Sequence, residues 1–113
     1  MTMQARQLGE TTIIALSGRL DGMTMSEVEE QFLALIEQGR SRFVFDMSGL
    51  EYISSAGLRV MLLAVKKTRA AGGKLALFAV TGNVDEVFQM SGFSTIFAIF
   101  ATEEEALSYI AAS

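Results

Sequence analysis

The stretch that decides the fold runs from residue 42 to residue 70 and reads RFVFDMSGLEYISSAGLRVMLLAVKKTRA. It opens with a short, nearly continuous apolar run that ends at Asp46, as expected of a strand buried on both faces. Four apolar residues then recur at the spacing of one helical face, namely Leu58, Met61, Leu62 and Val65. We therefore expect a buried strand over 42–46 and an amphipathic helix that starts at Ser54 or Ser55 and ends at Gly72-Gly73.

Strand and helix patterns alternate on both sides of this stretch. Strands are expected over 3–8, 11–17, 74–79 and 96–100, and Gly9-Glu10 predicts a two-residue hairpin turn between the first two. Helices are expected over 24–38, 83–90 and 102–111; Thr24 and Glu27 have the form of a capping box, and 102–105 caps the last helix. The order β-β-α-β-α-β-α-β-α predicts a single α/β domain over 1–113 with a mixed, mostly parallel sheet.

The composition limits the chemistry that this chain can perform. It has 113 residues, half of them hydrophobic, and neither cysteine nor histidine. This excludes thiolate chemistry, serine–histidine hydrolases and ordinary zinc sites. The net charge of −4, without a basic stripe, argues against nucleic-acid binding. We expect no signal peptide, no membrane contact, no cofactor and no metal, hence a cytoplasmic binding domain that is not an enzyme.

Partner sites in open α/β sheets gather outside the carboxyl ends of the strands, and three segments are expected there: 17–22, 46–57 and 80–83. The middle segment carries three serines directly before a helix: Ser48, Ser54 and Ser55. The last two could simply cap that helix. Alternatively, a hydroxyl on its first turn, followed by the small residues Ala56 and Gly57, could be phosphorylated, because free N–H groups and the helix dipole tolerate a phosphate there.

Residues 43–58, FVFDMSGLEYISSAGL, resemble the signature of the anti-sigma factor antagonists, the STAS domain family. Residues 16–21 (LSGRLD) resemble the second-strand motif of the family, and residues 72–77 (GGKLAL) resemble a later strand. The resemblance covers essentially the whole chain in the same element order. It implies a bacterial partner-switching module for signal transduction and transcription regulation.

In that family, the unphosphorylated antagonist binds an anti-sigma factor that is also a serine kinase, of the histidine-kinase-like ATPase type, and so releases a sigma factor. The kinase then phosphorylates a serine at the start of the second helix and the complex dissociates, until a serine phosphatase resets the switch. Matching the motif residue by residue places the acceptor at Ser55. Many members carry aspartate immediately before the acceptor, where this chain has Ser54, so two hydroxyls compete. We expect Ser55 to be phosphorylated and Ser54 to cap the helix, with Ser54 as the alternative acceptor.

Other residues near this edge each have two interpretations. Asp21 and Asp46 could be turn residues or partner contacts, and three methionines could fill the core or form an adaptable protein-binding surface: Met23, Met25 and Met47. Gly57 is expected to allow close approach of a strand or of the partner. The predicted partner-binding residues are Asp21, Gly22, Met23, Asp46, Met47, Ser48, Ser54, Ala56, Gly57 and Arg59.

Three other functions stay open at this point. Asp46, at a strand end, could be the phospho-acceptor of a receiver domain, although Asp21 supplies no acidic pair for the Mg²⁺ that this chemistry needs. A flavodoxin-like enzyme is disfavoured because the glycines form neither a P-loop nor a G-x-G-x-x-G fingerprint. Within the family that the chain resembles, it could also be a scaffold, or a partner-switch protein that regulates secretion or signalling without a sigma factor.

Overall fold

The computed structural model describes residues 1–112, and Ser113 lies outside the described part. The elements follow one another as β1 (Thr2–Leu8), β2 (Thr11–Leu20), α1 (Met25–Glu37), β3 (Arg42–Ile53), α2 (Ser55–Ala70), β4 (Lys74–Phe78), α3 (Gly82–Ser91), η1 (Phe93–Thr95, a 3₁₀ turn), β5 (Ala98–Phe100) and α4 (Glu103–Ala111). The predicted order of strands and α-helices is confirmed.

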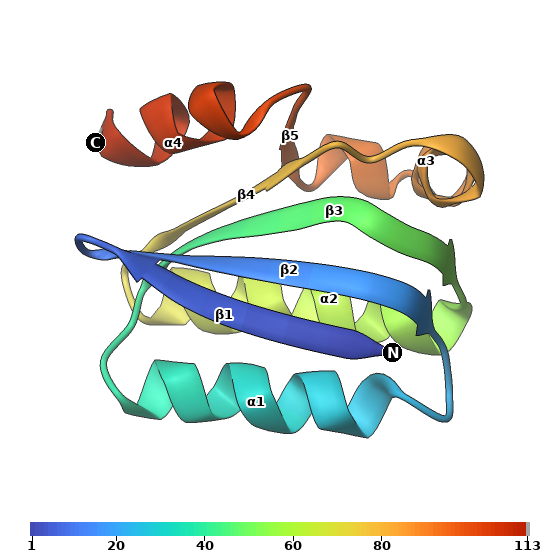
Figure 1. The fold of residues 1–113 in the computed structure, drawn as a ribbon, viewed down its shortest axis with the longest axis horizontal. Helices are drawn as coiled ribbons and strands as arrows, with labels where there is room; N and C mark the ends of the chain where they lie inside the picture. The colour runs from blue at the N-terminus through green and yellow to red at the C-terminus, as the bar shows by residue number, and fades with distance from the viewer. Residues whose placement is uncertain (113) are drawn as a thin grey trace.

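The strands form one sheet in the order β1-β2-β3-β4-β5 (Figure 1). β1 and β2 pair antiparallel across the Gly9-Glu10 turn, with Leu8 opposite Thr11. The other neighbouring strands are parallel, because a helical crossover separates each strand from the next. The sheet is therefore mixed and mostly parallel, as the sequence predicts.

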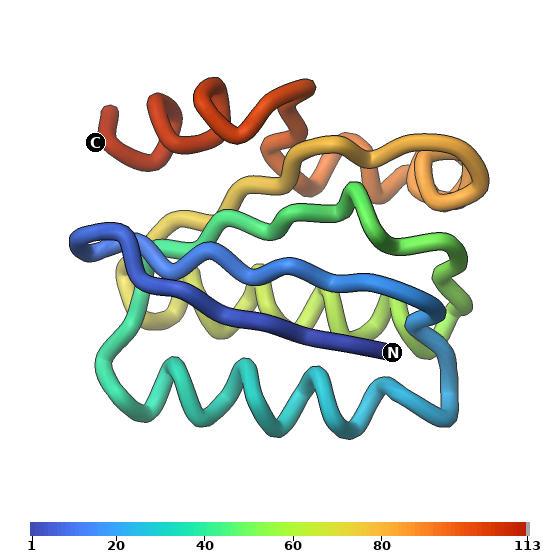
Figure 2. Tube along the Cα trace, viewed as in Figure 1, coloured from blue at the N-terminus to red at the C-terminus, as the bar shows by residue number. Residues whose placement is uncertain are grey.

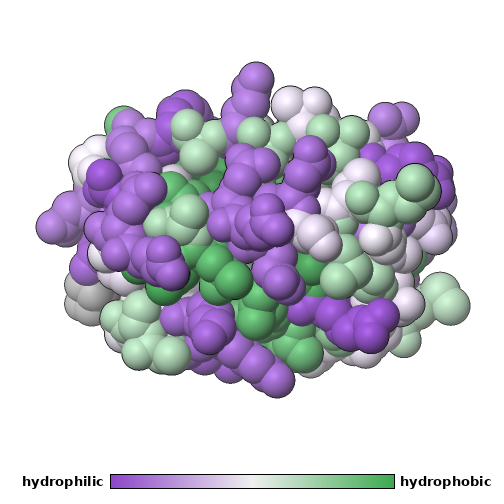
Figure 3. All heavy atoms as spheres, turned by 90° about the horizontal axis from the view of Figure 1, so that it is seen from below, coloured by the Kyte–Doolittle hydropathy of each residue, from purple (hydrophilic) through white to green (hydrophobic). Residues whose placement is uncertain are grey.

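The two faces of the sheet are covered unequally. α1 and α2 lie on one side and α4 lies on the other (Figure 1). The larger core joins residues of α1, α2 and α3 to inward-facing strand residues such as Phe43 and Phe45. The smaller core joins Ala106 and Ile110 of α4 to Ile13 and to β3 and β4. Seen from the α1 side, hydrophilic residues surround a narrow strip of hydrophobic ones (Figure 3).

β3 is longer than predicted, and this changes where its side chains lie. The predicted strand ended at Asp46, whereas β3 continues to Ile53 and stays paired with β2 as far as Leu20. Two register shifts interrupt this pairing, one between Ala15 and Ser17 and one between Gly18 and Arg19. Such irregularities break the alternation of buried and exposed side chains. The sequence pattern therefore misses the strand over 47–53.

The start of α1 also differs from the prediction. Thr24 directly precedes the helix, but its hydroxyl donates to the Arg19 carbonyl oxygen (2.8 Å) and accepts from the Asp21 N–H (3.0 Å). No side-chain cap forms at this end of α1. The predicted capping box is therefore wrong, because the loop after β2 takes up the hydroxyl. At α4, by contrast, Thr102 and Glu105 form a complete capping box.

The carboxyl-terminal third confirms the predicted elements with shifted bounds: α3 is longer than predicted, and β5 and α4 are shorter. Gly92 ends α3 with φ +79°, a conformation that glycine adopts without strain. The next three residues form η1, so β5 begins at Ala98 instead of at the predicted residue 96. Of the helices in residues 1–112, none combines the length and the apolarity needed to cross a membrane.

Candidate functional site at the start of α2

The start of α2 is fixed to the end of β2 by backbone and side-chain hydrogen bonds. The Ser54 N–H donates to the Leu20 carbonyl oxygen (3.0 Å), so β2, β3 and α2 meet at this point (Figure 2). The Ser54 hydroxyl oxygen accepts from the Gly57 N–H (3.2 Å). Ser54 has extended backbone angles, the geometry of a helix N-cap. The prediction that Ser54 caps the helix is confirmed.

Ser55 is the first residue of α2 and its side chain is exposed. Its neighbour Ala56 is half-buried and adds little bulk beside the hydroxyl. Arg59 lies one helical turn further on and is also exposed. Residues four apart lie on the same face of a helix, so Ser55 and Arg59 share one accessible face of α2.

Gly57 is buried where the start of α2 packs against the end of β2. A Cβ atom at this position would lie 2.6 Å from the Leu20 carbonyl oxygen and 2.8 Å from Ile53 Cγ1. Both distances are shorter than real Cβ contacts, so any side chain would push the helix off the sheet. Of the two predicted reasons for this glycine, close helix–strand approach is the one that the geometry supports.

The loop after β2 lies beside this helix start. The Asp21 carboxylate accepts from the Met23 N–H (3.0 Å) and lies 3.7 Å from Arg19 Nε. Asp21 therefore stabilises the turn in which it lies, which confirms the first of its two interpretations, a turn residue. Gly22 and Met23 are exposed, and Met23 shows 95% of its surface. An exposed thioether of this size is available for contact with another protein.

Asp46, Met47 and Ser48 do not join this cluster. Asp46 lies within β3, and its carboxylate accepts from both the N–H (2.9 Å) and the hydroxyl (2.7 Å) of Ser48. β3 ends at Ile53, seven positions after Asp46, which is roughly 23 Å of extended strand. Met47 is only 1% exposed and belongs to the core. Of the two interpretations of each residue, the structure supports a local hydrogen-bonding role for Asp46 and a core role for Met47. β3 continues past them, so they do not lie beside Ser55, and a partner contact of Asp46 or Ser48 stays a prediction.

Leu20 is the residue of this site that the sequence analysis missed. Its carbonyl oxygen holds Ser54, and its buried side chain fills the space beside Gly57. Leu20 lies three residues beyond the predicted strand over 11–17. The only signal for it is a single apolar residue between two charged ones at the end of the LSGRLD motif.

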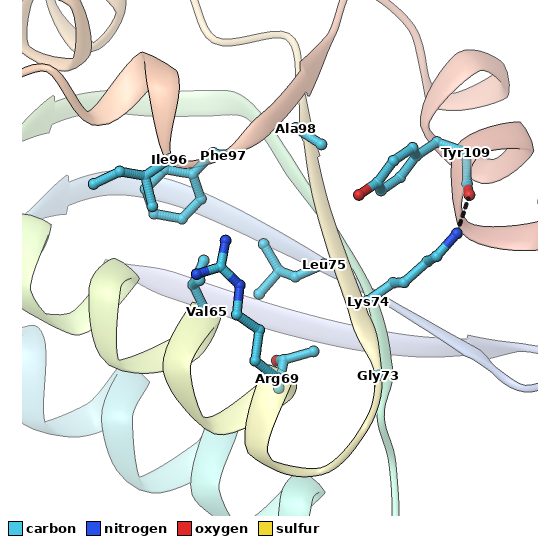
Figure 4. A pocket seen from close by; sticks show the side chains of 10 residues that line it. Val65, Arg69, Gly73, Lys74, Leu75, Ile96, Phe97, Ala98 and Tyr109 are labelled. Atoms are coloured by element: carbon cyan, nitrogen blue, oxygen red, sulfur yellow. Dashed lines mark hydrogen bonds between the residues drawn. The ribbon is translucent and has the colours of Figure 1, made fainter. Parts of the chain in front are cut away.

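A small hollow of about 100 Å³ lies at the other end of α2, between that helix, β4 and the segment before β5 (Figure 4). Arg69 and Lys74 lie along it, and Lys74 Nζ donates to the carbonyl oxygens of Tyr109 (3.3 Å) and Ala112 (2.7 Å). These bonds fasten the end of α4 to β4. Among residues 1–112, no three acidic side chains lie close enough to hold one metal ion.

Comparison with known proteins identifies a family and named relatives. The STAS domain family model matches residues 2–106. BtrV of Bordetella bronchiseptica, named as a candidate anti-sigma factor antagonist, is 39% identical over 94 residues, which is 83% of this chain and 81% of BtrV. The anti-sigma F factor antagonist of Lysinibacillus sphaericus is 28% identical over 102 residues, covering 89% of this chain and 86% of that protein.

Solved structures share the fold. A candidate anti-sigma factor antagonist from Thermotoga maritima superposes with a TM-score of 0.90 at 20% identity, over 96% of this chain and 93% of that one. Phosphorylated SpoIIAA of Bacillus superposes with a TM-score of 0.75 at 26% identity, over 96% of this chain and 99% of that one. The family model covers nearly all of the described residues, and BtrV reaches 39% identity. The chain therefore belongs to the STAS domain family.

Proposed function

We propose that this STAS domain is an anti-sigma factor antagonist whose binding to an anti-sigma factor kinase is ended by phosphorylation of Ser55. The observation that carries the proposal is the exposed hydroxyl of Ser55 on the first residue of a 16-residue helix. Two relatives with similar sequences are named as anti-sigma factor antagonists, and SpoIIAA has been solved in a phosphorylated form. Both facts support the proposal.

The environments of the two serines favour Ser55 as the acceptor. The Ser54 hydroxyl already accepts from the Gly57 N–H, and the Ser54 backbone is tied to Leu20. A kinase would have to break the helix cap to reach it. The exposed Ser55 side chain can be reached without disturbing the helix. Ser54 therefore acts as the structural partner of the acceptor in this proposal.

The size of the electrostatic terms explains why a phosphate would act on a complex and not on the fold. A phosphoserine adds about −1.5 to −2 charges at neutral pH. On an exposed helix start the dipole favours this charge by about 0.3–1 kcal/mol, so the monomer stays folded. SpoIIAA is consistent with this, because its unphosphorylated and phosphorylated forms superpose on this chain with TM-scores of 0.77 and 0.75. In a docked interface, an unpaired buried charge costs about 3–5 kcal/mol, so the complex would dissociate.

The surface around Ser55 supplies the remaining contacts in this proposal. Met23 offers an adaptable apolar contact beside the helix start, and Arg59 offers a cation on the same helix face. Gly22 and Ala56 leave the approach to Ser55 open. The kinase would be of the histidine-kinase-like ATPase type, and a serine phosphatase would restore the binding form. The switch would operate in the bacterial cytoplasm.

The first experiment identifies the acceptor. The domain and its Ser54→Ala and Ser55→Ala variants are incubated with ATP and the anti-sigma factor kinase of the same organism, and the phosphorylated residue is mapped by mass spectrometry. We expect one phosphate on the wild type and on Ser54→Ala, and none on Ser55→Ala. Phosphate on Ser55→Ala but not on Ser54→Ala would assign the acceptor to Ser54 instead.

The second experiment tests the switch itself. Calorimetry compares kinase binding of the unphosphorylated domain with that of the domain carrying phosphoserine at position 55. We expect an affinity loss of more than about a hundredfold. Ser55→Ala should stay bound in the presence of ATP. Equal affinity of the two forms would refute partner switching, even if Ser55 proves to be the acceptor.

A further inference from the structure

Three turns border a half-open, polar hollow at the end of the sheet opposite Ser55. It measures about 390 Å³ and is lined by the β1–β2 turn, the loop between α1 and β3, and the turn between α2 and β4. These turns lie together at the left of Figure 1, whereas α2 begins at the right. The lining residues that matter are Glu10, Arg40, Ser41 and Arg42.

The hollow has fixed walls. The Lys74 N–H donates to the Ser41 carbonyl oxygen (3.0 Å), which ties the turn after α2 to the loop after α1. The Arg40 N–H donates to the Leu35 carbonyl oxygen (3.1 Å) and holds that loop against the end of α1. Gly73 packs so tightly on Ser41 that a Cβ atom there would overlap the Ser41 carbonyl oxygen. The two arginines are thus presented by backbone that is held in place.

One atom of Arg40, a residue that lines the hollow, lacks a partner. Arg40 Nε is buried, and within residues 1–112 it makes no hydrogen bond. A buried N–H of a charged group is rarely left unpaired, and an ion or an ordered water usually completes it. Arg42 lines the same hollow, and Glu10 is its acidic lining residue. The two ion pairs of residues 1–112 are Arg6–Glu103 and Arg19–Asp21, so neither arginine of the hollow is neutralised by a carboxylate there.

We propose that this hollow binds a small ligand through a phosphate or sulfate group held by Arg40 and Arg42. Guanidinium groups donate two parallel hydrogen bonds to such oxyanions, and the unpaired N–H favours a turn of the Arg40 side chain that brings Nε to such a group. Two cations against one carboxylate leave the site with a net positive charge in a chain whose net charge is −4. At about 390 Å³ the hollow has room for an organic portion as well.

This site is independent of the proposed phosphorylation. α2 has 16 residues, so at about 1.5 Å per residue the hollow lies roughly 24 Å from Ser55. A ligand in the hollow does not touch the helix start, and binding there does not depend on which serine a kinase modifies.

The test measures the melting temperature and amide NMR shifts of the full chain during titration with sodium phosphate, sodium sulfate or sodium chloride at constant ionic strength. We expect phosphate and sulfate to raise the melting temperature and to shift amides of residues 39–42 in a saturable way, and chloride to do neither. Arg40→Gln and Arg42→Gln should each weaken phosphate binding by about tenfold or more, whereas Glu10→Gln should strengthen it. Lys66→Gln, which removes the same charge from the exposed face of α2, is the matched control and should leave the affinity unchanged.

Adenosine monophosphate serves as a second probe, because it distinguishes a phosphate group carried by an organic ligand from free inorganic phosphate. Tighter binding than inorganic phosphate supports a site for a phosphorylated organic ligand, and equal binding supports a site for the free oxyanion. Absence of a saturable response to both, or an equal loss in Lys66→Gln and Arg40→Gln, overturns the proposal. If Arg40→Gln fails to fold, the other two variants still test the proposal: Arg42→Gln should weaken phosphate binding and Glu10→Gln should strengthen it. Arg40→Met adds a signature of its own: without the unpaired N–H it should melt above the wild type in chloride and show no response to phosphate.

Discussion

At the scale of single residues, Ser54 and Ser55 are neighbours with opposite environments. Ser54→Ala removes the hydroxyl oxygen that accepts from the Gly57 N–H, and loss of such a cap costs about 1 kcal/mol. Ser55→Ala removes an exposed hydroxyl and should change the free energy of unfolding by less than about 0.5 kcal/mol. Urea unfolding followed by circular dichroism measures both. Equal losses would mean that the cap is shared between the two serines.

Two glycines near the same helix start also differ in environment, and alanine substitutions at them should differ in their effect on stability. Gly57→Ala places a Cβ atom 2.6 Å from the Leu20 carbonyl oxygen, and overpacking of this kind costs about 1–3 kcal/mol. Gly22→Ala is the control, because a Cβ atom there meets nothing within 4 Å. We expect the midpoint of chemical unfolding to fall for Gly57→Ala only. An unchanged midpoint for Gly57→Ala would mean that α2 can shift away from β2 without loss.

At the scale of elements, the regular spacing of hydrophobic residues made most helices and strands predictable. Where that spacing is interrupted, the boundaries could not be predicted. The helix after Ser54, the β1–β2 hairpin and the cap of α4 follow from local spacing and turn chemistry, which the structure confirms. β3 could not be bounded in this way, because the register shifts against β2 hide its second half. That single error misplaced Asp46, Met47 and Ser48. It also concealed Leu20, whose role depends on pairing with a distant strand.

The attachment of α4 gives a prediction at this scale. Ile110 is 1% exposed and fills the smaller core, whereas Leu107 packs at its margin and is half-buried. Ile110→Ala should lower the free energy of unfolding by about 2–5 kcal/mol, because it leaves a cavity. Leu107→Ala, measured in the same urea titration, should cost clearly less. A larger loss for Leu107→Ala would mean that α4 is rotated on the sheet.

At the scale of the whole molecule, the sheet has a protected centre and an open side. β3 is paired on both sides and covered on both faces, while β1 has a neighbour on one side only. We expect amides of Val44 and Phe45 to exchange with deuterium last, near the rate of global unfolding, and amides of β1 to exchange among the first. Hydrogen exchange followed by NMR measures both. Equally slow exchange in β1 would show that another molecule covers this strand in solution.

α4 is fastened at both ends, by Arg6 to Glu103 at its start and by Lys74 to the Ala112 carbonyl oxygen at its end. It alone supplies the helical cover for Ile13, Val44 and Ala76, which the ribosome makes much earlier. In a nascent chain that has been synthesised only as far as residue 105, the apolar residues on this face of the sheet are therefore exposed to solvent. The domain can close only when that late segment leaves the exit tunnel, and until then the bare strands are what a ribosome-associated chaperone would meet.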